Sequence, residues 1–125
     1  MPDRFPSADL DHLRQARLAE VLTGPPDAPR RTTIWVVVDD RDRVLVRSVR
    51  GPRGRWYRDL LADPAGVLNV AGTRIPFVAQ GADDEERIAA CSMALRAKYR
   101  PGESLDSMLK DDTLSTTLEL LPRPA

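Results

Sequence analysis

Hydrophobic and polar positions alternate over several short segments of the chain, which is the pattern expected of β-strands. Ile34 to Val38 is instead a continuous β-branched and aromatic run, as expected for a strand buried on both faces. Asp39 to Asp42 makes the turn into the following strand, so these segments predict a central hairpin. Six strands are expected, at about residues 17–23, 34–38, 44–50, 67–71, 74–79 and 114–120.

Segments with helical spacing are fewer than the strands. A short helix capped by Ser7 is expected over residues 7–15. A second short helix carries Trp56 and Tyr57 on an amphipathic pattern and is broken by Asp63-Pro64. These signals come from caps, helix breakers and the spacing of apolar residues.

The longest helix is expected over residues 83–99, where acidic residues at the start and basic residues at the end complement the helix dipole. Its buried stripe should consist of Ile88, Cys91, Leu95 and Tyr99. Pro76 should place part of its strand at a sheet edge or bulge, because proline cannot donate a ladder hydrogen bond. With six strands and two main helices that do not alternate regularly, we expect a mainly β or α+β fold with an antiparallel sheet or small barrel.

Composition fits one soluble domain covering residues 1–125, with 42% hydrophobic and 30% charged residues. The formal net charge is zero, so no nucleic-acid partner is expected. Cys91 is the only cysteine, which excludes an intrachain disulfide. No apolar run approaches the length of a membrane span, and the N-terminus lacks the apolar core of a signal peptide. We therefore expect a cytoplasmic protein without a membrane partner.

Positive charge is concentrated in one segment, since seven of the seventeen arginines fall between residues 41 and 58. On the expected strand, Ser48 and Arg50 share a face, and a glycine-bearing turn then leads into the Trp56 helix. The unpaired N–H groups at a helix N-terminus, with Arg50, Arg53 and Arg55 beside them, suit a phosphate or carboxylate. The alternative is a solvated arginine face on an ordinary hairpin.

Residues for protein-based catalysis are few. His12 is the only histidine and lies in an expected surface helix, so neither a histidine-based triad nor a His/Cys zinc site can be assembled. Asp39 is expected to serve the turn. Trp56 and Tyr57, beside the cationic turn, can stack on a planar ligand or donate a phenolic proton; the alternative for Trp56 is a core anchor. Tyr57 is the candidate catalytic donor, and Trp35 is expected in the core.

Four passages of the chain resemble an uncharacterised bacterial family of small proteins grouped with the split β-barrel flavin-binding superfamily. They read TTIWVVVDD, VLVRSVRGPRGRWYRDLLADP, ALRAKYRPG and TTLELLPR, and the resemblance spans nearly the whole chain from about Ala8. The segment from Ser48 to Pro64 is also similar to the deazaflavin-dependent nitroreductases. In those relatives a strand ends in a serine, a glycine-bearing turn follows, and a helix with Trp-Tyr and a leucine pair meets the cofactor phosphate.

The resemblance implies a split β-barrel homodimer whose pocket holds FMN or the 8-hydroxy-5-deazaflavin coenzyme. The protein would then be an oxidoreductase that transfers hydride to or from a small organic substrate, with an apolar dimer interface around the central hairpin. The residues implied to hold the anionic tail are Arg47 or Arg50, Ser48, Arg53 and Arg55, with Trp56 and Tyr57 anchoring the helix or walling the pocket.

Two other functions remain open. One is a non-redox module that binds a small anionic ligand and no cofactor. The other is a cofactor-free isomerase or lyase that uses Tyr57, Arg50 and an acid such as Asp39 in the same pocket.

Overall fold

The computed structural model describes residues 4–123, in which seven strands form one antiparallel sheet of order β2-β1-β5-β6-β7-β4-β3. The strands are β1 (Ala19–Thr23), β2 (Arg30–Ile34), β3 (Val36–Val38), β4 (Val44–Val46), β5 (Ala65–Val70), β6 (Thr73–Gly81) and β7 (Leu118–Pro122). The helices are α1 (Ser7–Gln15), the 3-10 turn η1 (Gly51–Arg53), α2 (Arg55–Ala62), α3 (Glu85–Lys98), α4 (Glu103–Met108) and α5 (Asp111–Leu114).

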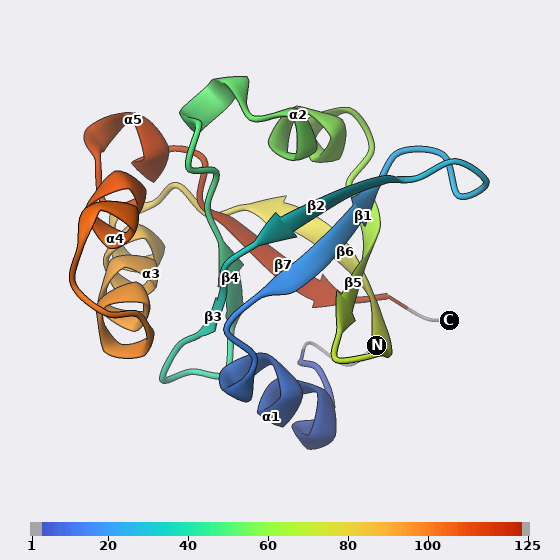
Figure 1. The fold of residues 1–125 in the computed structure, drawn as a ribbon, viewed down its shortest axis with the longest axis horizontal. Coiled ribbons are helices and arrows are strands. Elements are labelled where there is room, and N and C mark those ends of the chain that lie inside the picture. The colour runs from blue at the N-terminus through green and yellow to red at the C-terminus, as the bar shows by residue number, and fades with distance from the viewer. Residues whose placement is uncertain (1–3, 124–125) are drawn as a thin grey trace.

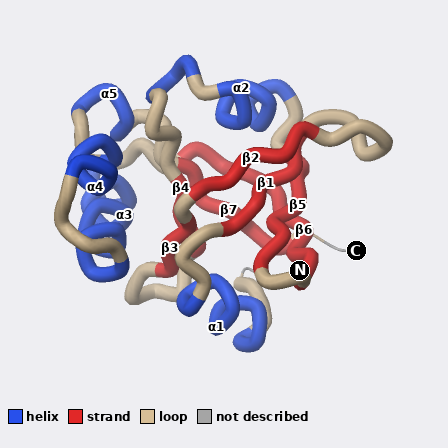
Figure 2. Tube along the Cα trace, in the orientation of Figure 1, coloured by secondary structure: helices blue, strands red, loops and turns tan. Residues whose placement is uncertain are grey.

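The sheet curls into a half-barrel (Figures 1 and 2). β2 and β3 lie at opposite edges of the strand order, yet Trp35 alone separates them in the chain. The two edges therefore approach one another at this residue. In Figure 1, α1 lies at one end of the curled sheet and α2 at the other, while α3, α4 and α5 gather beside β3 and β4.

Two apolar cores hold the fold together. The first fills the curled sheet and is closed by Leu10 and Leu13 of α1 and by Trp56 and Leu60 of α2. The second lies on the outer side of β3 and β4, beneath α3 and α4, and consists of Val37, Leu45, Ala82, Cys91, Leu95, Tyr99, Leu105 and Met108. Burial raises the pKa of the Cys91 thiol to about 11, which fits a core residue.

The run from Ile34 to Val38 is buried on both faces, as predicted, because its side chains alternate between these two cores. Ile34 and Val36 belong to the first core and Val37 to the second. The prediction of a single strand was wrong, since the run divides at Trp35, where the partner changes from β1 to β4. This division is the physical reason for seven strands in place of six.

The C-terminal prediction was wrong in its boundaries. Residues 103–114 form α4 and α5, and β7 begins only at Leu118. A row of hydroxyls closes the intervening turn: Thr116 donates to the Thr113 carbonyl oxygen at 2.6 Å, and Thr117 to that of Leu114 at 2.8 Å. Of the alternating residues, Leu118 and Leu120 lie in β7, whereas the Thr116 hydroxyl bonds to the local backbone. With α4 and α5, residues 4–123 contain five α-helices, where the sequence predicted two main helices and one further short one.

The remaining elements match the sequence more closely. Pro76 lies where β6 pairs with β5 alone, because pairing with β7 starts at Phe77. Cys91 and Leu95 of α3 are buried, with Ile88 half-buried beside them. The helix N-cap near residue 7 is Pro6, not Ser7, which is the first helical residue.

Candidate functional site

The arginine-rich segment leaves the sheet earlier than predicted. β4 ends at Val46, and a turn begins at Ser48, whose carbonyl accepts the Gly51 N–H at 2.9 Å. Ser48 and Arg50 therefore do not share a strand face. β4 is short because its partner β7 begins at Leu118, opposite Val46. The segment then continues through η1 directly into α2.

Ser48 uses its side chain to close this turn. Its Oγ donates to the Gly51 carbonyl oxygen at 2.8 Å, and its N–H donates to Thr116 Oγ1 at 3.0 Å. Gly54 packs so closely that a Cβ there would lie 2.2 Å from Ser48 Oγ. The turn therefore requires glycine at position 54, which is also the N-cap of α2 and offers no capping side chain. The first N–H groups of α2 are left available to a ligand.

Arg47 points into the protein and is only 1% exposed. Its Nε donates to Thr117 Oγ1 at 2.9 Å, and one terminal nitrogen donates to Ser92 Oγ at 3.0 Å and to the Met108 carbonyl at 3.1 Å. The other donates to the Ile88 carbonyl at 3.1 Å. Burial away from water lowers the pKa of Arg47 below its ordinary value. The residue joins α3, α4 and the turn before β7.

A polar contact fixes α2 over the curled sheet. Asp59 of α2 accepts hydrogen bonds from Thr23 Oγ1 of β1 at 2.8 Å and from Arg30 Nε of β2 at 2.9 Å. Partial burial raises the pKa of Asp59, but the hydrogen bonds from Thr23 and Arg30 outweigh this effect and hold it below its usual value. The middle of α2 is thereby held against β1 and the edge strand β2.

Between the edge strand β2 and the segment 47–56 lies a cleft of about 610 Å³, which we call the seam cleft. Its lining residues are Leu18, Thr32, Thr33, Ile34, Trp35, Arg47, Ser48, Val49, Arg50, Gly54, Arg55, Trp56, Ser104, Ser107 and Met108. Five of the seven predicted site residues are among them. The structure thus brings Arg47, Ser48, Arg50, Arg55 and Trp56 to one cavity.

The seam cleft is electrostatically one-sided: its lining includes three arginines and no carboxylate. Within residues 4–123, the arginines of the segment 47–58 make no ion pair, whereas Arg43 pairs with Asp39 and Glu86. A second cleft of about 560 Å³, beside α3, contains those paired charges and is lined by both signs. Unpaired positive charge is therefore concentrated beside the seam cleft, although the whole chain is neutral.

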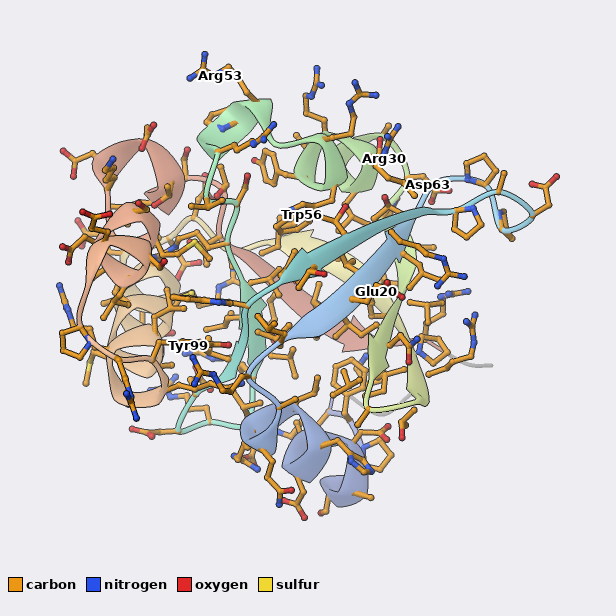
Figure 3. All side chains as sticks on the ribbon, in the orientation of Figure 1. Glu20, Arg30, Arg53, Trp56, Asp63 and Tyr99 are labelled. Atoms are coloured by element: carbon orange, nitrogen blue, oxygen red, sulfur yellow. The ribbon has the colours of Figure 1, made fainter. Side chains whose placement is uncertain are left out.

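Two predicted site residues lie outside this lining. Arg53 is exposed on the outer surface of η1 (Figure 3). Tyr57 is half-buried, packs against the first core and makes an edge contact with Trp56, with ring centroids 6.5 Å apart. Consecutive helical residues point about 100° apart, so Trp56 and Tyr57 cannot share one face. Trp56 is the residue that lines the cleft.

Trp35 is the functional candidate that the sequence did not indicate. It was expected in the core, but it is half-buried and lines the seam cleft. Strand alternation provides the reason, because Ile34 and Val36 point into the curled sheet and Trp35 points to the other side. The cleft wall from α4, with Ser104 and Ser107, was also missed; the helical spacing of Leu105, Met108 and Leu109 was the available signal.

Neither His12 nor Asp39 contributes to the seam cleft. His12 is exposed on α1, and Asp39 accepts hydrogen bonds from the N–H groups of Arg41 and Arg43 at 2.9 Å each, the turn role that was predicted. No group of three or more metal-ligating side chains occurs within residues 4–123. Over the same range, no helix combines the length and apolar character that crossing a membrane requires.

This architecture is an α+β fold with a seven-stranded antiparallel sheet curled into a half-barrel, and its fold is similar to that of several solved structures. The heme storage protein HutZ of Vibrio cholerae superposes with a TM-score of 0.68 at 14% identity, over 98% of this chain and 92% of that one. An FAD-binding protein from Mycobacterium smegmatis gives a TM-score of 0.61 at 18% identity, over 96% and 91%. A NimC/NimA family protein from Clostridium acetobutylicum gives 0.64 at 16%, over 92% and 77%.

The chain itself belongs to DUF2255, a family described as an uncharacterised protein conserved in bacteria, whose model matches residues 9–120. No curated protein shows a significant match to the sequence. The expected membership of an uncharacterised bacterial family is thus confirmed, and the half-barrel fold is shared with the superposed structures.

Proposed function

We propose that the seam cleft binds a phosphorylated planar cofactor, FMN or the 8-hydroxy-5-deazaflavin coenzyme, and that the protein is an oxidoreductase acting on a small organic substrate. The observation that carries the proposal is the cleft's charge: three arginines, the uncapped start of α2 and no carboxylate. Such a site favours a dianionic phosphate over a neutral or cationic group. Its volume lies within the range of small-molecule sites.

The chemistry of the lining favours a cofactor over catalysis by the protein alone. The described residues that line the cleft supply hydroxyls, guanidinium groups and indoles, but no carboxylate, imidazole, phenol or thiol. A cofactor-free isomerase or lyase needs a general base there, and Tyr57 and Asp39 lie elsewhere. A bound flavin-type group would supply the hydride chemistry, while the protein binds and orients it.

The phosphate contact is assigned to Arg50 and Arg55, because the Arg47 guanidinium already donates its hydrogen bonds to groups of the protein. Arg50→Ala should weaken FMN binding by about 1.5 to 3 kcal/mol, the contribution of hydrogen bonds to a charged group. Arg53→Ala is the matched control, since Arg53 is an exposed arginine of the same turn outside the cleft. Calorimetry on both variants measures the difference. Equal losses of FMN affinity in both variants would indicate a general attraction to positive charge and would contradict a specific contact from Arg50.

The visible spectrum separates an oxidoreductase from a simple binding module. Titration with FMN or the deazaflavin should shift the cofactor absorption bands, and the bound cofactor should be reducible by a nicotinamide donor or by dithionite and reoxidised by a nitroaromatic acceptor. A ligand that binds without perturbation of its ring spectrum and without turnover supports the non-redox alternative.

We propose further that a second copy completes the site. The sequence predicts an interface around the central hairpin, but the chain's own α1 and α3 pack on β3, and Val37 and Leu45 are buried in the second core, which favours another surface. Exposed apolar surface lies instead at the cleft rim, where Leu18 is 55% and Val49 is 53% exposed.

Sedimentation equilibrium should therefore give twice the chain mass of 13.9 kDa, and Val49→Asp should shift the protein toward monomer. Leu61→Asp is the control, because Leu61 on α2 is at least as exposed as Val49, at 62%, but does not line the cleft. A monomer of unchanged ligand affinity at micromolar concentration would contradict the shared site.

A further inference from the structure

Trp35 lines the seam cleft and stacks on a second aromatic ring, that of Tyr99. Its indole lies parallel to the Tyr99 ring, with centroids 3.8 Å apart and an interplanar angle of 4°. Tyr99 is buried near the end of α3, whereas Trp35 is half-buried and lines the cleft. Figure 3 places Tyr99 beside α3, on the side of the sheet edge formed by β3. One face of the Trp35 indole is therefore covered by Tyr99, and the residue also lines the seam cleft.

The backing ring is itself fixed by two contacts. Tyr99 Oη donates to the Arg17 carbonyl oxygen at 2.7 Å. Lys98 Nζ lies 5.5 Å from the Tyr99 ring centroid and donates to the carbonyls of Leu13 and Val36 at 2.8 and 2.6 Å. These bonds join α1, β3 and α3 around the stack, so the Trp35 ring is positioned before any ligand arrives.

Trp35 differs from the other indole in the cleft. Trp56 is only 6% exposed, belongs to the first core and has Tyr57 against its ring. The cleft thus contains a buried indole beside the arginine-bearing turn and a more exposed indole on the β2–β3 connection. Planar conjugated rings gain favourable dispersion and electrostatic contact on such an exposed, rigid aromatic surface.

We propose that Trp35 is the stacking platform for the planar ring of the ligand, so that the ring lies at the β2–β3 connection while the phosphate meets Arg50 and Arg55. This inference rests on the proposed function and names the specificity-determining residue of the same site. The two ends of the ligand then contact different elements: the phosphate contacts the turn before α2, and the planar ring contacts the β2–β3 connection.

The test compares FMN with ribose 5-phosphate, which carries a phosphate monoester but no planar ring. Trp35→Leu should weaken FMN binding by roughly 10-fold, within the range found for stacking of planar bases on aromatic residues. The same variant should leave ribose 5-phosphate affinity unchanged, because its anion contacts are intact. Trp35→Phe should restore part of the FMN affinity. Arg50→Ala should weaken both ligands.

A spectroscopic reading accompanies the affinities, since the chain has only two tryptophans. In the Trp56→Phe variant, Trp35 is the sole indole, and FMN should quench its fluorescence strongly while ribose 5-phosphate does not. Equal FMN affinity in wild type and Trp35→Leu overturns the platform and leaves the proposed function standing. An equal loss of affinity for FMN and for ribose 5-phosphate in Trp35→Leu also overturns the platform, because Trp35 would then only shape the cleft. A wild-type protein that binds neither ligand overturns the proposed function and the platform together.

Discussion

Replacing Trp56 with alanine is expected to lower the free energy of unfolding by about 3 to 5 kcal/mol, the usual cost of truncating a buried aromatic side chain. Trp56 is 6% exposed and closes the first core from α2 together with Leu60. Because it also lines the seam cleft, the variant should bind ligand more weakly at any temperature where it remains folded. Chemical denaturation with a two-state fit measures the loss.

Tyr57→Phe is the control for this experiment. Tyr57 packs against the same core from the same helix, and no hydrogen bond of its hydroxyl is seen among residues 4–123, so the melting temperature should hardly change. The sequence assigned Tyr57 the catalytic proton, and its position outside the cleft lining predicts unchanged ligand affinity as well. A functional loss in Tyr57→Phe, with the fold intact, would return Tyr57 to the site. Full stability in Trp56→Ala would show that the first core does not need its indole.

Arg47→Ala is expected to lower the free energy of unfolding by about 3 kcal/mol. Each hydrogen bond from a charged donor contributes about 1.5 to 3 kcal/mol, but the variant also avoids the cost of burying the guanidinium charge, which offsets part of the loss. The buried guanidinium donates to Thr117, Ser92 and two backbone carbonyls. Arg47→Lys should recover only part of the loss, since an ammonium lacks the planar fork that reaches several acceptors at once.

Arg50→Ala is the matched comparison for stability. Arg50 is exposed on the neighbouring turn, so its removal should change the free energy of unfolding by no more than about 0.5 kcal/mol. The two variants should therefore differ in what they lose: Arg47→Ala loses stability, and Arg50→Ala loses ligand affinity. If Arg47→Ala keeps its stability and instead loses FMN affinity, Arg47 is an anion ligand, as the sequence alone suggested.

Local signals predicted α1, α2, α3 and the hairpins β3–β4 and β5–β6, but not α4 and α5. The helix breaker Asp63-Pro64 ends α2 in the expected place, and the acidic start of α3 coincides with its N-cap Asp84, which accepts the Arg87 N–H. Such features depend on neighbours a few residues away, and they can be read directly from the chain. The arginine-rich turn was recognised for the same reason, although it begins at Ser48 and not after Arg50.

Features that depend on distant partners were not predictable in the same way. Arg47 and Arg50 look alike in the sequence, but Arg47 is buried because Met108 and Thr117 supply acceptors from 61 and 70 positions away. Trp35 was predicted as one residue of a continuous strand, and the sequence does not show that this strand divides there, where the pairing partner changes from β1 to β4. Identifying the site therefore required tertiary structure.

The position of β7 affects how the chain can fold during synthesis. β7 lies between β6 and β4 in the middle of the sheet, and Val46 pairs with Leu118 across a long stretch of sequence. A ribosome must therefore complete residue 122 before β4 gains its inner neighbour. Until then, β4 and β6 both present unpaired edges, which are templates for aggregation. Nascent chains should therefore expose these two edges until β7 has been synthesised.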